Sequence, residues 1–300
     1  MIEARSITKF FSVVNDKGLA EGLTAVLNIS LTIQEGKIVT LLGSSGCGKS
    51  TFLEILAGLQ APTDGEIVID GKRVLEPLPS TRKEMEDYKR RYRFISPLAN
   101  GVFRNRPRND IAMIFQDYAV FPWMTAIQNV IFALKLRNSG KTGLSKNELR
   151  EKARYYLNQV DLGSVEHKYP SQLSGGMRQR LALARALSVE PKIILMDEPF
   201  AAVDALTREK LQDDLLRLWD GRRSIAAPIT IVMVTHDVPE AVYLSDEVVV
   251  FSPSPGSIRN RVPVAIERPR ARTDPAILAI QDRIFAMFQY DLNQESEYSI

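Results

Sequence analysis

The residues best suited to chemistry lie at positions 43–51, where glycines and small polar residues lead to a lysine and two hydroxyl residues. In order they are Gly43, Ser44, Ser45, Gly46, Cys47, Gly48, Lys49, Ser50 and Thr51. Backbone N–H groups at glycines can close around phosphate oxygens, Lys49 supplies a positive charge, and the Ser50 hydroxyl can ligate Mg²⁺. The spacing predicts a phosphate-binding loop for a nucleoside triphosphate rather than a Gly/Ser turn that carries a surface lysine.

The segments on either side of this loop provide the context that the motif requires. Residues 38–42 form a short apolar run, as expected of a strand covered on both faces, and residues 51–59 can form a helix. A helix that starts after such a loop turns its positive end toward a bound anion. We therefore expect strand, loop and helix to form one phosphate site.

A second strand pattern begins at Lys192, is apolar over 193–196 and ends in two carboxylates, Asp197 and Glu198. Open parallel sheets place their ligands beyond the strand ends, so these acids are expected beside the phosphate. There Asp197 would help to hold Mg²⁺, and Glu198 could polarise a water molecule as general base. An Asp-Glu pair after a strand is by itself more often a solvated turn. The phosphate loop in the same chain favours the catalytic interpretation.

Residues 173–180 read Leu-Ser-Gly-Gly-Met-Arg-Gln-Arg and lead into a helical pattern at 181–187. The first residues of that helix, Ser174, Gly175 and Gly176, can bind an anion at its N-terminus. Taken alone, the same residues could be an ordinary N-cap followed by two flexible glycines.

The order of these motifs resembles the ATP-binding subunit of an ABC transporter. The phosphate loop is followed by Gln116, by the Leu-Ser-Gly-Gly segment, by Ile-Leu-Met-Asp-Glu-Pro at 194–199 and by Thr-His-Asp at 235–237. Few other families with such a loop carry Leu-Ser-Gly-Gly before the acidic strand. The resemblance covers residues 1–265. It implies an α/β P-loop NTPase of the ABC type, with a mostly parallel sheet core, an antiparallel N-terminal β region and a helical lobe.

The resemblance also implies that two such subunits pack head to tail, with each ATP between the phosphate loop of one and the Leu-Ser-Gly-Gly helix of the other. Ser174, Gly175 and Gly176 would then contact the γ-phosphate that Lys49 of the opposite copy binds. Asp204 would lie where the two subunits cross. The family's small-Ala-Leu-Asp pattern is Ala-Ala-Val-Asp here, which puts only fine packing in doubt.

Further residues take roles by the same resemblance. His236 would contact the γ-phosphate within its own chain, and Gln116 would touch Mg²⁺ and the attacking water, so that both join Glu198 in the catalytic group. Phe11 would stack on adenine, which leaves its neighbour Phe10 as the residue that faces the core.

We expect one ATPase domain at 1–265, with a helical lobe at about 117–190, and a C-terminal tail at 266–300. Residues 73–109 are an insertion relative to the family, strongly basic and interleaved with aromatic residues. The insertion could bind anionic lipid headgroups, a regulator or nucleic acid. A solvated excursion with a small aromatic core is the preferred interpretation.

The C-terminal part of the sequence indicates which group within the ABC family the chain resembles. A Ser-Pro-Ser-Pro-Gly turn at 252–256, a strand at 259–264 and Arg-Pro-Arg at 268–270 are similar to the importer ATPases of the nitrate, sulfonate, taurine and bicarbonate group. An aromatic cluster at 121–124 stands where relatives receive a helix of the membrane subunit, or else it packs inside the lobe. Apolar residues at helical spacing in the tail predict an amphipathic helix packed on the core: Ile277, Ile280, Ile284 and Met287.

Composition describes an ordinary globular chain. Its 300 residues can bury a core, and a net charge of +3 is too small to indicate nucleic acid, so no such partner is expected. Cys47 is the single cysteine, which excludes an internal disulfide and suits a reducing cytosol. No signal peptide is recognisable, and the longest apolar stretch, near 225–234, is too short to span a bilayer. Contact with a membrane would then require a partner.

Together these patterns favour a subunit that hydrolyses ATP, with Mg²⁺, to power the import of a small anionic solute. The expected partners are a second copy or a paired ATPase subunit, transmembrane permease subunits and, indirectly, a periplasmic or extracellular solute-binding protein. The expected location is the cytoplasmic face of the cell membrane. Two alternatives remain open: a soluble ABC ATPase of repair or translation, and a nucleotide-gated binding module without turnover. The first usually carries tandem cassettes or coiled coils, and Glu198 argues against the second.

Overall fold

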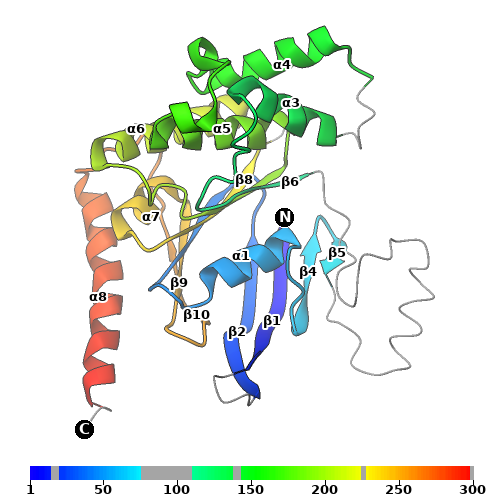
Figure 1. The fold of residues 1–300 in the computed structure, drawn as a ribbon. Helices are drawn as coiled ribbons and strands as arrows, with labels where there is room; N and C mark the ends of the chain where they lie inside the picture. The colour runs from blue at the N-terminus through cyan, green and yellow to red at the C-terminus, as the bar shows by residue number, and fades with distance from the viewer. Residues whose placement is uncertain (15–19, 76–109, 138–142, 224–227, 298–300) are drawn as a thin grey trace, which may run out of the picture.

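The computed structural model describes residues 1–14, 20–75, 110–137, 143–223 and 228–297 (Figure 1). The helices from the middle of the chain lie together at the top of the view, and the N-terminal strands lie below them. Apart from its first three residues, the predicted basic insertion at 73–109 lies outside the described residues.

The larger sheet has six strands in the order β10-β9-β3-β8-β7-β6. Their bounds are β3 (Ile38–Leu42), β6 (Ile111–Ile114), β7 (Ile193–Asp197), β8 (Thr230–Thr235), β9 (Glu247–Phe251) and β10 (Ile258–Pro263). The neighbouring strands from β9 to β6 are parallel, and β10 pairs antiparallel with β9. The predicted, mostly parallel core is confirmed. Because parallel strands end at one edge, β3, β7 and β8 bring the segments that follow them together.

A smaller antiparallel sheet holds the strands β2-β1-β4-β5. Their bounds are β1 (Ile2–Val14), β2 (Ala20–Ile33), β4 (Asp64–Ile69) and β5 (Lys72–Leu75). Ile2 pairs with Ile33 on one side and with Ile69 on the other, and all three side chains are buried. The antiparallel N-terminal β region expected from the family resemblance is therefore present.

Alternate residues of β8 point into two different apolar cores, one on each face of the larger sheet. Ile231 and Met233 pack with the helices at the top of Figure 1. Val232 and Val234 pack instead with α1 (Lys49–Ala57) and the smaller sheet. This alternation follows the two-residue period of a strand, and burial on both faces explains why the strand is apolar throughout. Consequently α1 and the helical lobe lie on opposite faces of the larger sheet.

The helices above the sheet are α3 (Ala126–Arg137), α4 (Lys146–Gln159) and α5 (Gly175–Ser188), with short 3₁₀ turns at Gly163–Val165 and Pro170–Gln172. Next to α5 lies α6 (Ala205–Arg223). A capping box begins α4: Ser145 accepts the N–H of Glu148, whose carboxylate accepts the N–H of Ser145 in return.

The C-terminal part adds α7 (Val238–Leu244) and the long helix α8 (Pro275–Glu297), which runs down the left of Figure 1. Ile277 and Ile284 are fully buried, while Ile280 and Met287 pack on the same cluster, which includes Val242 of α7. The predicted amphipathic helix is therefore confirmed. In the described part of the chain, every helix is too short or too polar to cross a membrane.

Candidate functional site

The predicted phosphate loop joins Leu42, at the end of β3, to Lys49, at the start of α1. Gly46 and Gly48 have φ values of 79° and 91°, which residues with a Cβ rarely adopt. A Cβ at Gly48 would also lie 2.3 Å from the carbonyl oxygen of Ala25. The loop follows this path because glycine stands at both positions.

Lys49 is buried and holds its ammonium group inside the loop. Its Nζ donates hydrogen bonds to the carbonyl oxygens of Gly43 (2.8 Å) and Ser44 (2.7 Å). Among the described residues no side chain caps the start of α1, so the first N–H groups of the helix point toward the loop beside this charge. Such a cluster suits a phosphate group. Cys47 is buried as a free thiol. The exposed residues of the loop tip are Ser44, Ser45 and Gly46.

Two oxygen-bearing side chains meet where α1 begins and β7 ends. The Ser50 hydroxyl donates a hydrogen bond of 2.8 Å to Asp197 Oδ1. Burial raises the pKa of Asp197, as does the charge of Glu198 beside it, while Ser50 and Lys49 act in the opposite direction. A hydroxyl and a carboxylate are hard oxygen ligands of the kind that Mg²⁺ prefers together with phosphate oxygens and water. These residues fit a magnesium ion next to a phosphate.

Glu198 and His236 lie side by side because β7 and β8 are neighbours in the sheet. Glu198 Oε1 is 3.3 Å from His236 Nδ1, and the imidazole is exposed. Glu198 has a φ of 43°, an unfavourable conformation for a residue with a side chain, and its N–H donates to the Val234 carbonyl at 3.0 Å. A carboxylate beside an accessible imidazole can hold or move a proton at this edge of the sheet.

Gln116 follows β6 and is exposed. Within the described residues no hydrogen bond joins it to Ser50 or Asp197, which bond to each other. Three residues further on, the Ala119 carbonyl accepts a hydrogen bond of 2.5 Å from Arg185 of α5. The loop after β6 is thus fastened to the helical lobe, and the metal-binding role of Gln116 stays a prediction.

Ser174, Gly175 and Gly176 form the start of α5. The Ser174 hydroxyl accepts the N–H of Met177 at 3.3 Å and so caps the helix. Gly176 is buried, and a Cβ there would lie 2.8 Å from the Thr207 methyl group of α6. α5 packs on α3, α4 and α6, across the larger sheet from α1 (Figure 1). These residues therefore lie apart from the phosphate loop of their own chain.

Residues 26–201 match the ABC transporter family. The chain belongs to this family. It is 36% identical to the nitrate import ATP-binding protein NrtD of Synechococcus elongatus, over 83% of this chain and 77% of that protein. It is also 36% identical to the aliphatic sulfonates import ATP-binding protein SsuB of Bacillus subtilis, over 92% and 91% of the two chains. An uncharacterised ABC transporter ATP-binding protein of Methanocaldococcus jannaschii is 39% identical, over 94% and 89%.

Solved structures agree with this ABC assignment. The ATP-binding cassette MJ0796, in a dimeric post-hydrolysis state bound to ADP and Pi, has a TM-score of 0.67 and 30% identity, covering 89% of this chain and 100% of that one. A second dimeric structure of MJ0796 has a TM-score of 0.66 and 29% identity over the same shares. The predicted ABC-type P-loop fold and the predicted ATP-hydrolysing subunit are confirmed.

Asp204, which is expected from the resemblance to lie between subunits, caps α6. Its Oδ1 accepts the N–H of Thr207 at 3.1 Å, and this hydrogen bond lowers the pKa of the Asp204 carboxyl. Asp204 is exposed, and Leu206 beside it is 84% exposed. The loop before α6 thus presents a carboxylate at the surface, and the first turn of α6 presents a large apolar side chain.

The expectation that Phe10 faces the core is wrong. Its side chain is 47% exposed and lies across Gly22 of β2, where an added Cβ would overlap the ring. The pairing of β1 with β2 shifts register between Lys9 and Phe10, and such an irregularity re-aims side chains in a strand. Phe11 is half-buried, with the Lys9 ammonium 4.9 Å from its ring centroid. Adenine stacking on Phe11 stays a prediction.

Two buried polar residues near His236 were not predicted. Glu240 is 5% exposed and Gln212 is 2% exposed, and Gln212 Nε2 donates a hydrogen bond of 3.0 Å to Glu240 Oε2. Burial raises the pKa of Glu240 to about 7. The sequence Asp-Val-Pro-Glu at 237–240 is a helix-start signal that could have drawn attention to Glu240. Gln212 lies 28 residues away and has no local signal of this kind.

Proposed function

We propose that this ABC ATPase hydrolyses ATP at sites shared by two copies of the chain and so powers the uptake of a small anion through a membrane permease. The observation that carries the proposal is the meeting of two side-chain pairs at one edge of the sheet, Ser50 with Asp197 and Glu198 with His236. The first pair suits the metal ion of the nucleotide, and the second suits proton transfer at the γ-phosphate.

The phosphate loop would hold the triphosphate. Backbone N–H groups of residues 46–51 would surround its oxygens, and Lys49 would exchange its bonds to loop carbonyls for bonds to phosphate. Ser50 and Asp197, together with Gln116, would hold Mg²⁺. That ion, when bound, neutralises the charge that develops on the phosphates.

Glu198 would accept a proton from the attacking water, since its carboxylate lies just beyond the end of β7, beside His236. His236 would orient that carboxylate through Nδ1 and contact the γ-phosphate with the rest of its exposed ring. The strained φ of Glu198 supports this assignment, because backbone strain concentrates at functional sites.

A second copy would complete each site. The start of α5 and the phosphate loop lie across the sheet from each other, so Ser174, Gly175 and Gly176 would serve the nucleotide of the opposite copy. Exposed Asp204 and Leu206 would then be covered by the interface. The dimeric structures of the similar cassette MJ0796 support this arrangement.

The relatives NrtD and SsuB, by their names, import nitrate and aliphatic sulfonates, which are both small anions. A solute of this class is therefore proposed here. Trp123 is exposed, and its ring lies 5.5 Å from that of Phe121, so this pair offers an apolar contact for a permease helix. The chain would then sit on the cytoplasmic face of the membrane, with a solute-binding protein on the other side.

The test compares wild-type protein with Glu198→Gln and with a control, Glu151→Gln, which changes an exposed carboxylate on α4. We expect Glu198→Gln to lower kcat by about 10²–10⁴-fold, because the general base is lost. The same variant should accumulate as an ATP-bound dimer on size exclusion, whereas the control should behave as wild type. Wild-type protein that dimerises with ATP but shows no turnover, even with permease subunits, would favour a nucleotide-gated binding module instead.

A further inference from the structure

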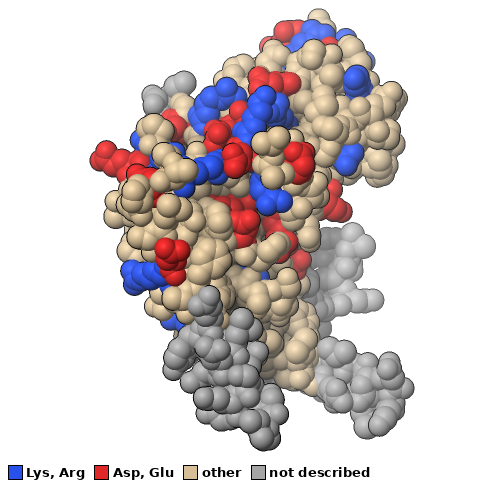
Figure 2. Space-filling model, turned by 90° about the vertical axis from the view of Figure 1, so that its left-hand side faces the viewer, with Lys and Arg blue, Asp and Glu red and all other residues tan. Residues whose placement is uncertain are grey.

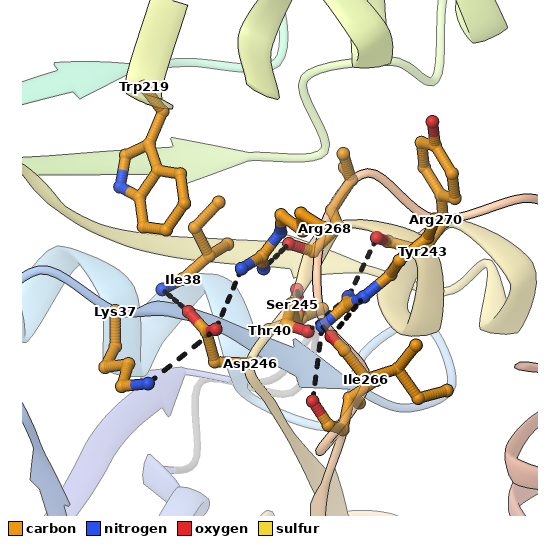
Figure 3. Close-up of polar contacts among 12 residues, drawn as sticks. Lys37, Ile38, Thr40, Trp219, Tyr243, Ser245, Asp246, Ile266, Arg268 and Arg270 are labelled. Atoms are coloured by element: carbon orange, nitrogen blue, oxygen red, sulfur yellow. Dashed lines mark hydrogen bonds and ion pairs between the residues drawn. The ribbon is translucent and has the colours of Figure 1, made fainter. Parts of the chain in front are cut away.

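The C-terminal tail is fastened to the end of α7 by two arginines (Figure 3). Arg270 is buried, which lowers its pKa to about 10. Arg268 donates hydrogen bonds to the Leu244 carbonyl (2.5 Å) and to Asp246 Oδ1 (2.8 Å). The Arg270 guanidinium donates to five carbonyl oxygens, those of Val242, Tyr243, Ser245, Val264 and Ile266. The tail and the end of α7 are therefore held as one unit.

Two residues after Arg270, Arg272 contacts α6. Its Nη1 donates to Gln212 Oε1 at 2.7 Å, and its Nη2 donates to Asp213 Oδ1 at 2.9 Å. The guanidinium also lies 3.6 Å from the ring centroid of Tyr243 in α7, within the range of a cation–π contact. Arg272 thus joins the tail to α6 and α7 at one point.

Gln212 links Arg272 to the buried Glu240. Its amide oxygen accepts from Arg272, and its amide nitrogen donates to Glu240 Oε2 at 3.0 Å. An amide bound at both ends cannot exchange its oxygen and nitrogen without losing both hydrogen bonds. The Glu240 carboxylate, on α7, is therefore fixed from the α6 side by a residue that the tail itself orients.

Two hydrogen bonds link Glu240 to the backbone on both sides of His236. The Thr235 hydroxyl accepts the N–H of Asp237 at 3.1 Å. Asp237 Oδ1 in turn accepts the N–H of Glu240 at 2.8 Å. His236 stands between Thr235 and Asp237, with its imidazole 3.3 Å from Glu198. A shift of Glu240 would therefore move Asp237 and, with it, the backbone that directs the imidazole.

These contacts border a cavity of about 250 Å³ between α6, α7 and α8. It belongs to the side of the molecule shown in Figure 2, where charged side chains of both signs gather. Arg208, in the wall, lies 3.6 Å from Asp237 and donates to the Val203 carbonyl at 3.2 Å. The residue after His236 is thereby also tied to the loop before α6.

We propose that Arg272, Gln212 and Glu240 form a relay through which the C-terminal tail positions His236. They are positioning residues, because their hydrogen bonds reach His236 only through its neighbours Asp237 and Thr235. The expected effect on turnover rests on the function proposed above for His236, whereas the effect on the imidazole does not. A partner that lifts the tail from α7 would lower turnover without occupying the nucleotide site.

Histidine NMR of the full-length protein tests the relay. The chain has two histidines, so the ring resonances of His236 and His167 can be followed separately, with His236→Gln to assign them. Arg272→Ala and Gln212→Leu break the relay at different points, and Arg272→Lys keeps a donor. Arg261→Ala is the matched control, since it removes an ion pair with Glu247 at the surface of the neighbouring strand pair. Thermal unfolding shows that each variant is folded.

We expect the His236 resonances to shift in Arg272→Ala and in Gln212→Leu, while those of exposed His167 stay unchanged. The kcat for ATP should fall about 3- to 10-fold with KM within about twofold, and the double variant should lose little more than either single one. Arg272→Lys should recover most of the loss, and Arg261→Ala should match wild type.

Unshifted His236 resonances in the folded relay variants would overturn the proposal, whatever their turnover. If Gln212→Leu does not fold, the His236 resonances of Arg272→Ala alone test the relay. This variant is suitable because Arg272 is partly exposed and its loss opens no buried void. Wild-type turnover in His236→Gln is a separate outcome. It would contradict the catalytic role proposed for His236, while shifted resonances in the other variants would still support the relay.

Discussion

Single glycines decide whether the backbone of the phosphate loop can turn. At Gly48 a Cβ would meet the Ala25 carbonyl at 2.3 Å, whereas at Gly46 a Cβ would meet no atom within 4 Å, although both residues have positive φ. We expect Gly46→Ala to cost about 1–2 kcal/mol of stability, for the left-handed backbone alone. Gly48→Ala should cost clearly more and abolish ATP binding. Thermal unfolding without Mg-ATP measures the stability of each variant, and the same experiment with Mg-ATP measures its ATP binding. Equal effects at the two positions would contradict the argument.

The Glu240 carboxyl should make stability depend on pH. Burial raises its pKa to about 7 from 4.5, with Asp237 acting in the same direction and Thr235, Gln212 and Arg208 acting against it. Because the folded-state pKa is the higher one, the folded protein binds more protons between these values. The stabilisation is full below pH 4.5 and is lost as pH rises through 7. The free energy of unfolding of wild type should therefore fall by roughly 3 kcal/mol relative to that of Glu240→Gln over this range.

Urea unfolding of the two proteins at several pH values between 4.5 and 8 measures this difference. Glu151→Gln, which changes an exposed carboxylate, serves as the control and should run parallel to wild type. A constant gap between wild type and Glu240→Gln at all pH values would show that Glu240 does not titrate in this window.

At the scale of elements, α8 is held by its apolar face. Ile284 is fully buried against the cluster that contains Val242 of α7, whereas Leu278 on the same helix is 44% exposed. We expect Ile284→Ala to lower the free energy of unfolding by about 2–4 kcal/mol, and Leu278→Ala by less than about 0.5 kcal/mol. Urea unfolding checks both values. Similar losses from the two substitutions would mean that α8 is not docked through this face.

The elements that local pattern defines could be predicted closely. Residues 38–42 form β3 as expected, and the apolar spacing in the tail identified α8. The helix after the phosphate loop begins at Lys49, two residues earlier than expected, and ends at Ala57 because Gly58 adopts a left-handed cap. Local patterns describe which residues alternate or repeat, and this is enough for strands and helices that are buried on regular faces.

Contacts between distant elements could not be predicted in this way. The register shift in β1 turned Phe10 outward, and the relay joins Arg272, Gln212 and Glu240 from three separate segments. Each is an ordinary polar residue in its own stretch of sequence. The pairing of Ser50 with Asp197, in contrast, could be anticipated, because parallel strands bring their ends to one edge.

At the scale of the whole molecule, the larger sheet separates the two halves of the proposed ATP site. The phosphate loop and α1 lie on one face, and α5 with its Ser-Gly-Gly start lies on the other, packed on α3, α4 and α6 (Figure 1). Both halves are built into the core, so neither can cross the sheet without unfolding. A second copy, related by a two-fold axis, can supply the missing half to each site at once.

Two defective variants should therefore restore activity when they are mixed. Lys49→Ala removes the charge of the phosphate loop, and Ser174→Arg blocks the start of α5, so each alone should be inactive. A mixed dimer has one intact site, formed by Lys49 of one copy and Ser174 of the other. With random pairing, half of the dimers are mixed, so turnover should recover to roughly a quarter of wild type. A mixture of Lys49→Ala with Ser50→Ala, which alter the same half, should stay inactive; recovery there, or none in the first mixture, would contradict the shared site.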